Sequence, residues 1–304
     1  TEVKKQPLTL LKKIRNDLLI IEMAINNNDV FHVTRVTKNV RGYKKKINAF
    51  ALKLIWDTFF PKQQLSFKQY SDYKEASETL ELSKTQIARL QKLSEIEVYL
   101  ETLLLIYLVR VKDLQNAKVH ADKLILKLHE INRRHLDLLG SVVYFYYSRT
   151  YELLGNLKDI RKNLFDIYRH ACIKRDELGQ ATLLNLLLRN FLHYKNYESA
   201  QQLISKTNFP ENRFNNELIR FLYYSGKIKA IQGEYADAFA RLTQAIRRAP
   251  ENTGLGFRVQ AQKLAIIVEL LLGEIPSRTI FSQAEISKFL KPYFFIVQAV
   301  HRGD

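Results

Sequence analysis

The stretch GKIKAIQGEYADAFARLTQAIRRAP, which runs from Gly226 to Pro250, has the punctuation of a helical hairpin. Gly233 can adopt the left-handed conformation that ends a first helix. Apolar residues between Ala236 and Ala249 then recur at the spacing of an amphipathic second helix. Pro250 would stop that helix after two arginines, whose charge suits a helix C-terminus. The stretch therefore predicts two antiparallel helices joined by a tight turn.

The turn of this hairpin recurs along the chain about every 40 residues. In each copy a small or polar pair precedes a large apolar residue, and a small or apolar residue follows three positions later. The large apolar residues of the copies are Leu114, Leu157, Tyr197, Tyr235 and Ile275, with weaker copies at Val30 and Tyr73. A period of this length is typical of proteins built from helical repeats.

Each turn is expected to follow an apolar-rich first helix, and the clearest of these cover residues 141–154, 180–194, 217–232 and 256–272. The window 219–252 fits the tetratricopeptide pattern of small, aromatic and proline positions, although the period is longer than usual. The sequence therefore predicts an all-α fold, an α-solenoid of tetratricopeptide-like hairpins with a period near 40 residues. The residues expected to shape the repeats are Gly155, Gly226, Gly233, Tyr235, Ala238, Ala245, Pro250 and Gly273.

Composition along the chain suggests three regions. Residues 1–64 form an N-terminal helical segment, residues 65–92 a polar linker or exposed helix, and residues 93–304 the repeat array. The middle region is expected to differ because it is rich in Lys, Glu, Ser, Thr and Gln and has no large apolar face.

The overall composition limits the class of protein. Hydrophobic residues make up 46% of the 304 residues, and the 10 glycines and 6 prolines are too few for a fold with many turns. The single cysteine, Cys172, excludes an internal disulfide framework and is interpreted as a small apolar helix residue. We expect no secretory signal and no membrane-spanning segment, because the apolar runs are short or interrupted.

The formal net charge of +17 suits an acidic partner. The basic residues are spread over the whole length, so no segment is a basic domain. The densest run is KNVRGYKKK, residues 38–46, and it is interpreted as a solvated helix face or loop.

No motif in the sequence indicates catalysis. The seven histidines are scattered, and a lone cysteine cannot complete a zinc site. The glycines of the segment 253–256 lack a third glycine and a preceding strand, so the segment reads as a loop before a helix. We therefore expect a protein that is not an enzyme and that needs no cofactor or metal.

One helix suggests a binding surface. The segment QATLLNLLLRNFLHY, residues 180–194, is apolar on nearly every side, and its polar exceptions Asn185, Arg189 and His193 stand four residues apart on one stripe. In one interpretation, Arg189 and His193 face a groove that holds an acidic partner. In the other, the stripe is a polar contact between neighbouring repeats. The sequence leaves both open.

The next first helix offers similar candidates. Its basic residues Arg220, Lys227 and Lys229 are mixed with Tyr223 and Tyr224. A basic and aromatic surface can also stack nucleic-acid bases, so binding of nucleic acid is an alternative function.

Long stretches of the chain resemble one family. These are INRRHLDLLGSVVYFYYSRTYELLG (131–155), GQATLLNLLLRNFLHYKNYESAQQLISK (179–206), YYSGKIKAIQGEYADAFARLTQAIRRAP (223–250), GFRVQAQKLAIIVELLLGEIP (256–276) and KPYFFIVQAVHRGD (291–304). They resemble the third non-ATPase subunits of the 26S proteasome regulatory particle, which are lid scaffolds of the PCI class. The resemblance is carried by residues 99–304.

The resemblance implies a non-catalytic scaffold of the proteasome lid, which supports ubiquitin-dependent protein degradation through protein–protein contacts in cytoplasm and nucleus. It implies other lid subunits as partners, among them a small, acidic, disordered one, and neither nucleic acid nor a membrane. A winged-helix module would follow Asp304, so the sequence is expected to be truncated before it. The rival functions are a PCI-type scaffold of an mRNA-export complex that binds nucleic acid, and a generic tetratricopeptide adaptor for acidic peptides.

Overall fold

The structure is a computed structural model that describes residues 5–29, 31–61, 82–131, 133–210, 214–250, 254–283 and 285–303. Every regular element in these ranges is a helix. The predicted all-α class is therefore confirmed. The chain divides into two compact units, residues 1–160 and 161–304, and each is described by itself.

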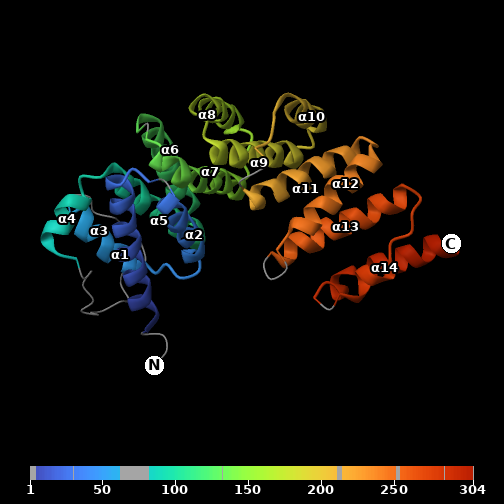
Figure 1. Cartoon of the computed structure of the whole chain (residues 1–304), viewed down its shortest axis with the longest axis horizontal. Helices are drawn as coiled ribbons and strands as arrows, with labels where there is room; N and C mark the ends of the chain where they lie inside the picture. The colour runs from blue at the N-terminus through green and yellow to red at the C-terminus, as the bar shows by residue number, and fades with distance from the viewer. Residues whose placement is uncertain are drawn as a thin grey trace. The chain divides into compact units, whose positions relative to one another are not determined.

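The N-terminal unit packs its helices around α5, which is buried on nearly every side. Helices α1 and α3 contact α5 from one end of the unit, and α6 and α7 follow it along the chain and contact it in turn (Figure 1). The helices are α1 (Lys5–Asn26), α2 (Phe31–Tyr43), α3 (Ala49–Phe59), α4 (Lys84–Leu90), α5 (Ser94–Val111), α6 (Leu114–Glu130) and α7 (His135–Leu154).

The C-terminal unit is a succession of hairpins. Helices α8 and α10 cover the same side of α9, and α11 packs against α9, α12 and α13 (Figure 1). The elements are α8 (Arg161–Lys174), α9 (Glu177–His193), α10 (Tyr197–Lys206), α11 (Asn215–Ile231), α12 (Tyr235–Arg248), α13 (Leu255–Leu271), the 3-10 helix η1 (Arg278–Ser282) and α14 (Ser287–Arg302). These bounds lie close to the predicted helices, except that α7 begins at His135 rather than Ser141.

The α11–α12 hairpin is packed tightly because small residues face each other. A Cβ atom added to Gly226 would lie 3.0 Å from Cγ of Leu242 and 3.3 Å from the carbonyl oxygen of Ala238. Ala238, Leu242 and Ala245 are fully buried. A larger residue at Gly226 or Ala238 would push the two helices apart.

The predicted turns share one backbone geometry. In six of these turns, all but the one at Tyr73, a residue with a positive φ lies two positions before the large apolar residue. The residue after it donates its N–H to the carbonyl oxygen five residues earlier, over 2.9–3.1 Å. This bond is the mark of the Schellman motif, which satisfies the free carbonyl groups at a helix end. In these six turns the residues with a positive φ are Asn28, Lys112, Gly155, Lys195, Gly233 and Gly273.

Two features of the turns differ from the prediction. The sequence assigned the left-handed conformation only to glycines, yet Asn28, Lys112 and Lys195 adopt it as well. The turn at Gly273 is not followed by a helix until η1, so Ile275 is 53% exposed and does not wedge between two helices. The weaker copy at Tyr73 and the residue Val30 lie outside the described residues.

The region 65–92 is described only from residue 82. There α4 begins with a capping box, in which Ser83 and Gln86 exchange side-chain and backbone hydrogen bonds. Most of its side chains are exposed, and Leu90 is buried. The three-part division of the chain remains a prediction.

A buried carboxylate ties three helices of the N-terminal unit together. Asp17 of α1 is 1% exposed, and its oxygens accept hydrogen bonds from Asn39 and Tyr43 of α2 and from Tyr99 of α5, at 2.8, 2.7 and 3.1 Å. Burial raises the pKa of Asp17, and the three hydrogen bonds oppose that shift. The same burial raises the pKa of Tyr99.

Candidate partner-binding site

The polar stripe of α9 begins inside the protein. Residues 181–188 are all buried, and Asn185 donates hydrogen bonds to the backbone oxygen and Oε2 of Glu217 on α11, at 2.9 and 3.0 Å. At this residue the stripe is a polar contact between two hairpins, which is the second of the two interpretations offered by the sequence.

The stripe reaches solvent toward the end of α9. Arg189 is half-buried and takes part in an interaction within the chain. His193, in the last turn of α9, is exposed, and its ring meets that of Tyr194 edge-on, with centroids 5.0 Å apart. His193 is therefore the member of the stripe that is most open to a partner.

Arg220 forms an ion pair with the buried carboxylate of Glu217, which is also on α11. Glu217 is 3% exposed, and Nη1 of Arg220 donates to its Oε1 at 2.5 Å. The side chain of Arg220 stays 40% exposed. Because a buried carboxylate needs charged or polar partners, Arg220 has a structural task and only part of its guanidinium faces solvent.

The two tyrosines of α11 differ in their surroundings. Tyr223 is half-buried, packs with residues of α12 and α13, and meets Phe257 edge-on at 5.3 Å between centroids. Burial raises the pKa of Tyr223. Tyr224 is also half-buried, and its ring lies 5.7 Å from that of Tyr223. Tyr223 thus serves the packing of the repeats.

The two lysines of α11 also differ. Lys229 is 9% exposed, and its ammonium lies 2.7 Å from a carboxylate oxygen of Glu234 and 2.5 Å from one of Asp237. Lys229 therefore closes the turn of its own hairpin. Lys227 is half-buried and has no ion pair within the described ranges. Lys227 is the lysine of this helix that is available to an acidic group.

The sequence also raised the questions of a metal site, a membrane-spanning helix and a glycine-containing loop at residues 253–256. No cluster of residues that could hold a metal ion occurs among the described residues. In the same ranges no helix combines the length and the apolar character needed to cross a bilayer. Gly254 has a left-handed conformation and directly precedes α13, which already includes Leu255 and Gly256. The expected loop over residues 253–256 is therefore wrong for its second half, and Thr253 lies outside the described residues.

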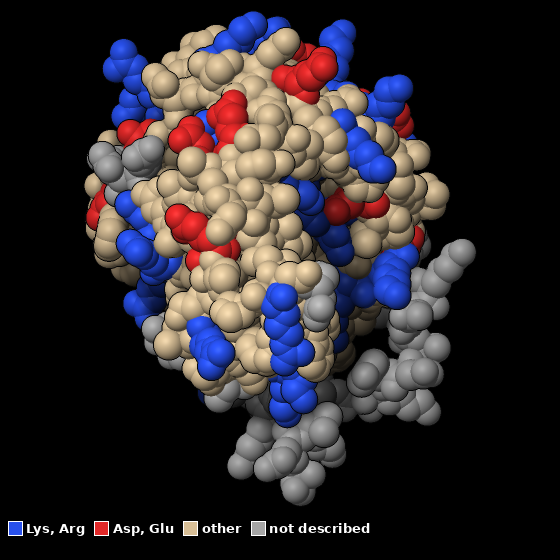
Figure 2. Space-filling model, turned by 90° about the vertical axis from the view of Figure 1, so that its right-hand side faces the viewer, with Lys and Arg blue, Asp and Glu red and all other residues tan. Residues whose placement is uncertain are grey.

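A pocket at the C-terminal end was not predicted from the sequence. It lies between η1 and α14, has a volume of about 390 Å³, and is lined by Phe281, Phe294, Arg278 and Lys291. Helix α14 has Lys288, Lys291 and Arg302 but no acidic residue. Figure 2 shows the face at this end, where blue and red side chains are scattered over a surface that is largely tan.

Comparison with known proteins decides the family. The family described as "PSMD3-like, N-terminal TPR repeats" matches residues 7–297. The chain belongs to this family. The PSMD3-like match confirms the tetratricopeptide-like class of the repeats. It also extends the resemblance, which the sequence alone placed at residues 99–304, over the N-terminal helices.

Three curated relatives of this PSMD3-like chain illustrate the match. The chain is 38% identical to the "Probable 26S proteasome non-ATPase regulatory subunit 3" of Drosophila melanogaster, over 100% of the chain and 62% of the relative. It is 42% identical to the protein of the same name from Nicotiana tabacum, over 94% and 59%. It is 36% identical to the "26S proteasome non-ATPase regulatory subunit 3" of Dictyostelium discoideum, over 96% and 60%. The chain thus spans about 60% of the length of these relatives.

Proposed function

We propose that the chain is a non-catalytic scaffold segment of the lid of the 26S proteasome regulatory particle. The observation that carries the proposal is the family match over residues 7–297, together with relatives named as non-ATPase regulatory subunits. The packing is consistent with this role, because the buried residues Asn185, Glu217 and Lys229 form hydrogen bonds or ion pairs within the chain. In this role the chain supports ubiquitin-dependent degradation by holding other subunits in place.

The partners in this proposal are other lid subunits, including a small, acidic, disordered one, in cytoplasm and nucleus. The charge of +17 favours acidic segments as ligands. On the C-terminal unit the contact residues would be Arg189 and His193 on α9 and Arg220, Tyr224 and Lys227 on α11. Lys229 and Tyr223 would support that surface from within, since their side chains already pack inside the unit.

Co-purification tests the proposed function. The full chain carrying an affinity tag is expressed in cells, and its partners are identified by quantitative mass spectrometry. We expect proteasome lid subunits to be enriched together. Recovery of none of them would contradict the scaffold role. Recovery of RNA whose binding weakens steeply with salt would favour the mRNA-export alternative instead.

A charge reversal tests the proposed surface. Lys227→Glu places a negative charge on α11, and Lys206→Glu places the same change on the exposed end of α10. Binding of a fluorescein-labelled peptide rich in Asp and Glu should weaken about fivefold in Lys227→Glu, as expected for one lost charge pair near a surface. The change in Lys206→Glu should be much smaller. Equal weakening in both variants would show that only the overall charge matters.

A further inference from the structure

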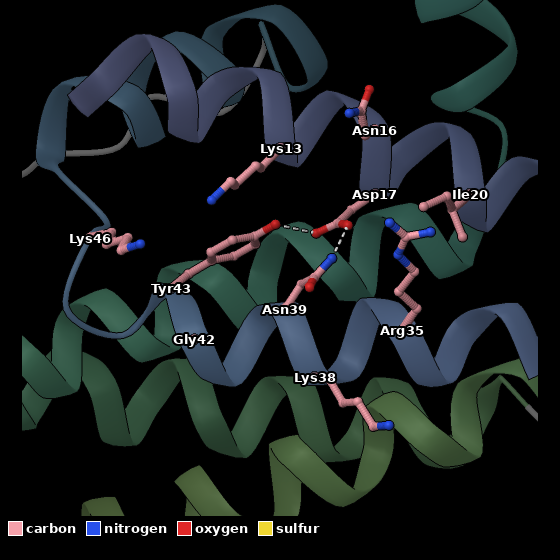
Figure 3. Close-up of a pocket in the computed structure, with 10 residues that line it drawn as sticks. All are labelled: Lys13, Asn16, Asp17, Ile20, Arg35, Lys38, Asn39, Gly42, Tyr43 and Lys46. Carbon is pink, nitrogen blue, oxygen red and sulfur yellow. Dashed lines mark hydrogen bonds between the residues drawn. The ribbon is translucent and has the colours of Figure 1, made fainter. Parts of the chain in front are cut away.

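A cavity between α1 and α2 has no part in the proposed scaffold role. Its volume is about 430 Å³, which falls within the range of small-molecule sites. Lys13 reaches into it from α1, Arg35 from α2, and Lys46 from the turn that follows α2 (Figure 3). We call these three residues the cationic rim.

Helical spacing builds the cavity from both sides. Lys13 and Asp17 stand four residues apart on α1, and Arg35 and Gly42 stand seven apart on α2, so each pair shares one face of its helix. A Cβ atom added to Gly42 would meet no atom within 4 Å. The absence of a side chain there leaves open space at the wall of the cavity.

The one acidic residue of the lining cannot neutralise the rim. Asp17 is 1% exposed and already accepts hydrogen bonds from Asn39, Tyr43 and Tyr99, the first two of which Figure 3 shows beside the cavity. Arg35 interacts with Asp17 only through their charges. Within the described ranges no member of the cationic rim forms an ion pair.

The chemistry of the lining selects a class of ligand. The lining contains four cations, the cationic rim and Lys38, and one buried carboxylate, which leaves an excess positive charge of three at this place. No thiol or imidazole lines the cavity, which argues against a transition metal, and Ile20 is its only large aliphatic residue. A phosphate monoester has a charge of about −1.5 to −2 and three strong acceptor oxygens, so this excess of positive charge and the N–H donors of the cationic rim favour it as a ligand.

We propose that the cavity binds a phosphate group, held by Lys13 and Arg35 with Lys46 at its edge. The group belongs either to a small phosphorylated molecule or to a phosphorylated serine or threonine of a protein. This site gives the charge run 38–46 a specific role, because that run supplies Gly42, Tyr43 and Lys46.

The test uses the full chain and three probes. The probes are inorganic phosphate, a fluorescein-labelled phosphoserine peptide, and the same peptide without its phosphate. Thermal shift reports binding of inorganic phosphate, and fluorescence anisotropy reports binding of the peptides. The variant Lys13→Glu with Arg35→Glu reverses the rim, and Lys44→Glu with Lys45→Glu makes the same charge change at exposed residues outside the lining.

Phosphate-dependent binding should fall at least about tenfold in the rim variant and less than about twofold in the Lys44/Lys45 variant. A preference for the phosphoserine peptide over inorganic phosphate would identify a protein source, and the reverse preference a small molecule. Equal binding of both peptides, or equal losses in both variants, would overturn the proposal. If the rim variant unfolds at a lower temperature, Lys13→Gln with Arg35→Gln replaces it, and unchanged phosphate binding there would also overturn the site.

Discussion

The α11–α12 hairpin turns at Gly233 and the α9–α10 hairpin turns at Lys195, and the two turns have the same backbone. Both residues have a positive φ, 87° and 57°. In one turn the amide of Glu234 donates to the carbonyl of Lys229, and in the other the amide of Asn196 donates to that of Phe191, each at 3.0 Å. The sequence pattern includes both turns, but only the first has a glycine at the left-handed position.

The residues whose carbonyl groups accept these two hydrogen bonds, Lys229 and Phe191, have chemically unrelated side chains. Lys229 forms ion pairs with Glu234 and Asp237, whereas Phe191 at the matching position is 5% exposed and lies under the guanidinium of Arg161, 4.8 Å from the ring centre. The comparison teaches that the backbone and the packing of the helices define the turn. The side chains that close it can be charged or aromatic.

The hairpins also differ in how much their second helix buries. Helix α12 has 14 residues and buries Ala238, Leu242 and Ala245, whereas α10 has 10 residues and buries Ala200 and Leu203. We therefore expect α11–α12 to contribute more of the stability of the C-terminal unit.

Truncation of a core leucine in each hairpin should give the largest effect. Leu242→Ala removes a fully buried side chain next to Gly226, and it should cost about 3–5 kcal/mol in the free energy of unfolding. Leu203→Ala, at a residue that is 9% exposed, should cost about 2 kcal/mol. Urea denaturation followed by circular dichroism measures both. An equal cost would refute the proposed ranking of the two hairpins.

Exchange of the left-handed residues should have opposite effects in the two turns. Gly233→Ala places a Cβ atom at a φ of 87° and should cost about 1–2 kcal/mol. Lys195→Gly relieves the same strain, but it also adds freedom to the unfolded chain, so the gain should be only about 0.5 kcal/mol. The melting temperatures of both variants test this pair. A loss of stability in Lys195→Gly would mean that its side chain stabilises the turn in some other way.

Loss of the ion pairs that Lys229 forms with Glu234 and Asp237 should have the smallest effect on stability. Lys229 holds the pKa of Asp237 below its ordinary value of 3.8, so this pair stabilises the protein fully above that pH and ceases to do so as the pH falls through the lowered pKa. Lys229→Met should therefore lower the melting temperature slightly at pH 7, and the difference should shrink in acid and in about 1 M salt.

Lys227→Met is the matched control for that change. It removes a lysine of the same helix that has no ion pair in the described ranges, so its melting temperature should not depend on salt in this way. A salt-independent effect of Lys229→Met would indicate that packing of the aliphatic stem matters more than the ion pairs.

Much of the fold could be predicted because the signals are local. Gly233, the buried Ala238 and the helix end before Pro250 define one hairpin within a short stretch. The period of about 40 residues then located the turns of the other hairpins. The turn at Gly273 could not be predicted in full, because the segment after it contains no run of apolar residues at helical spacing. There the pattern identified the turn correctly but wrongly implied a second helix directly behind it.

The candidate site was less predictable because burial and pairing depend on distant residues. Arg189 and Lys229 looked alike in sequence as cations on apolar helices, yet Lys229 is enclosed by its own hairpin. The role of Asn185 required Glu217 of the next first helix. The cavity between α1 and α2 was hidden for the same reason, since Lys13 and Arg35 meet only when the two helices pack.

The shared turn geometry has a consequence for hydrogen exchange. Each turn protects one amide by a single bond that breaks when the end of that helix frays, and these amides belong to Asp29, Asp113, Asn156, Asn196, Glu234 and Glu274. Their exchange rates therefore report local opening at six places from one end of the chain to the other. A partner that clamps one hairpin would slow one of these amides and leave the distant ones unchanged, so the set would show where along the chain the partner binds.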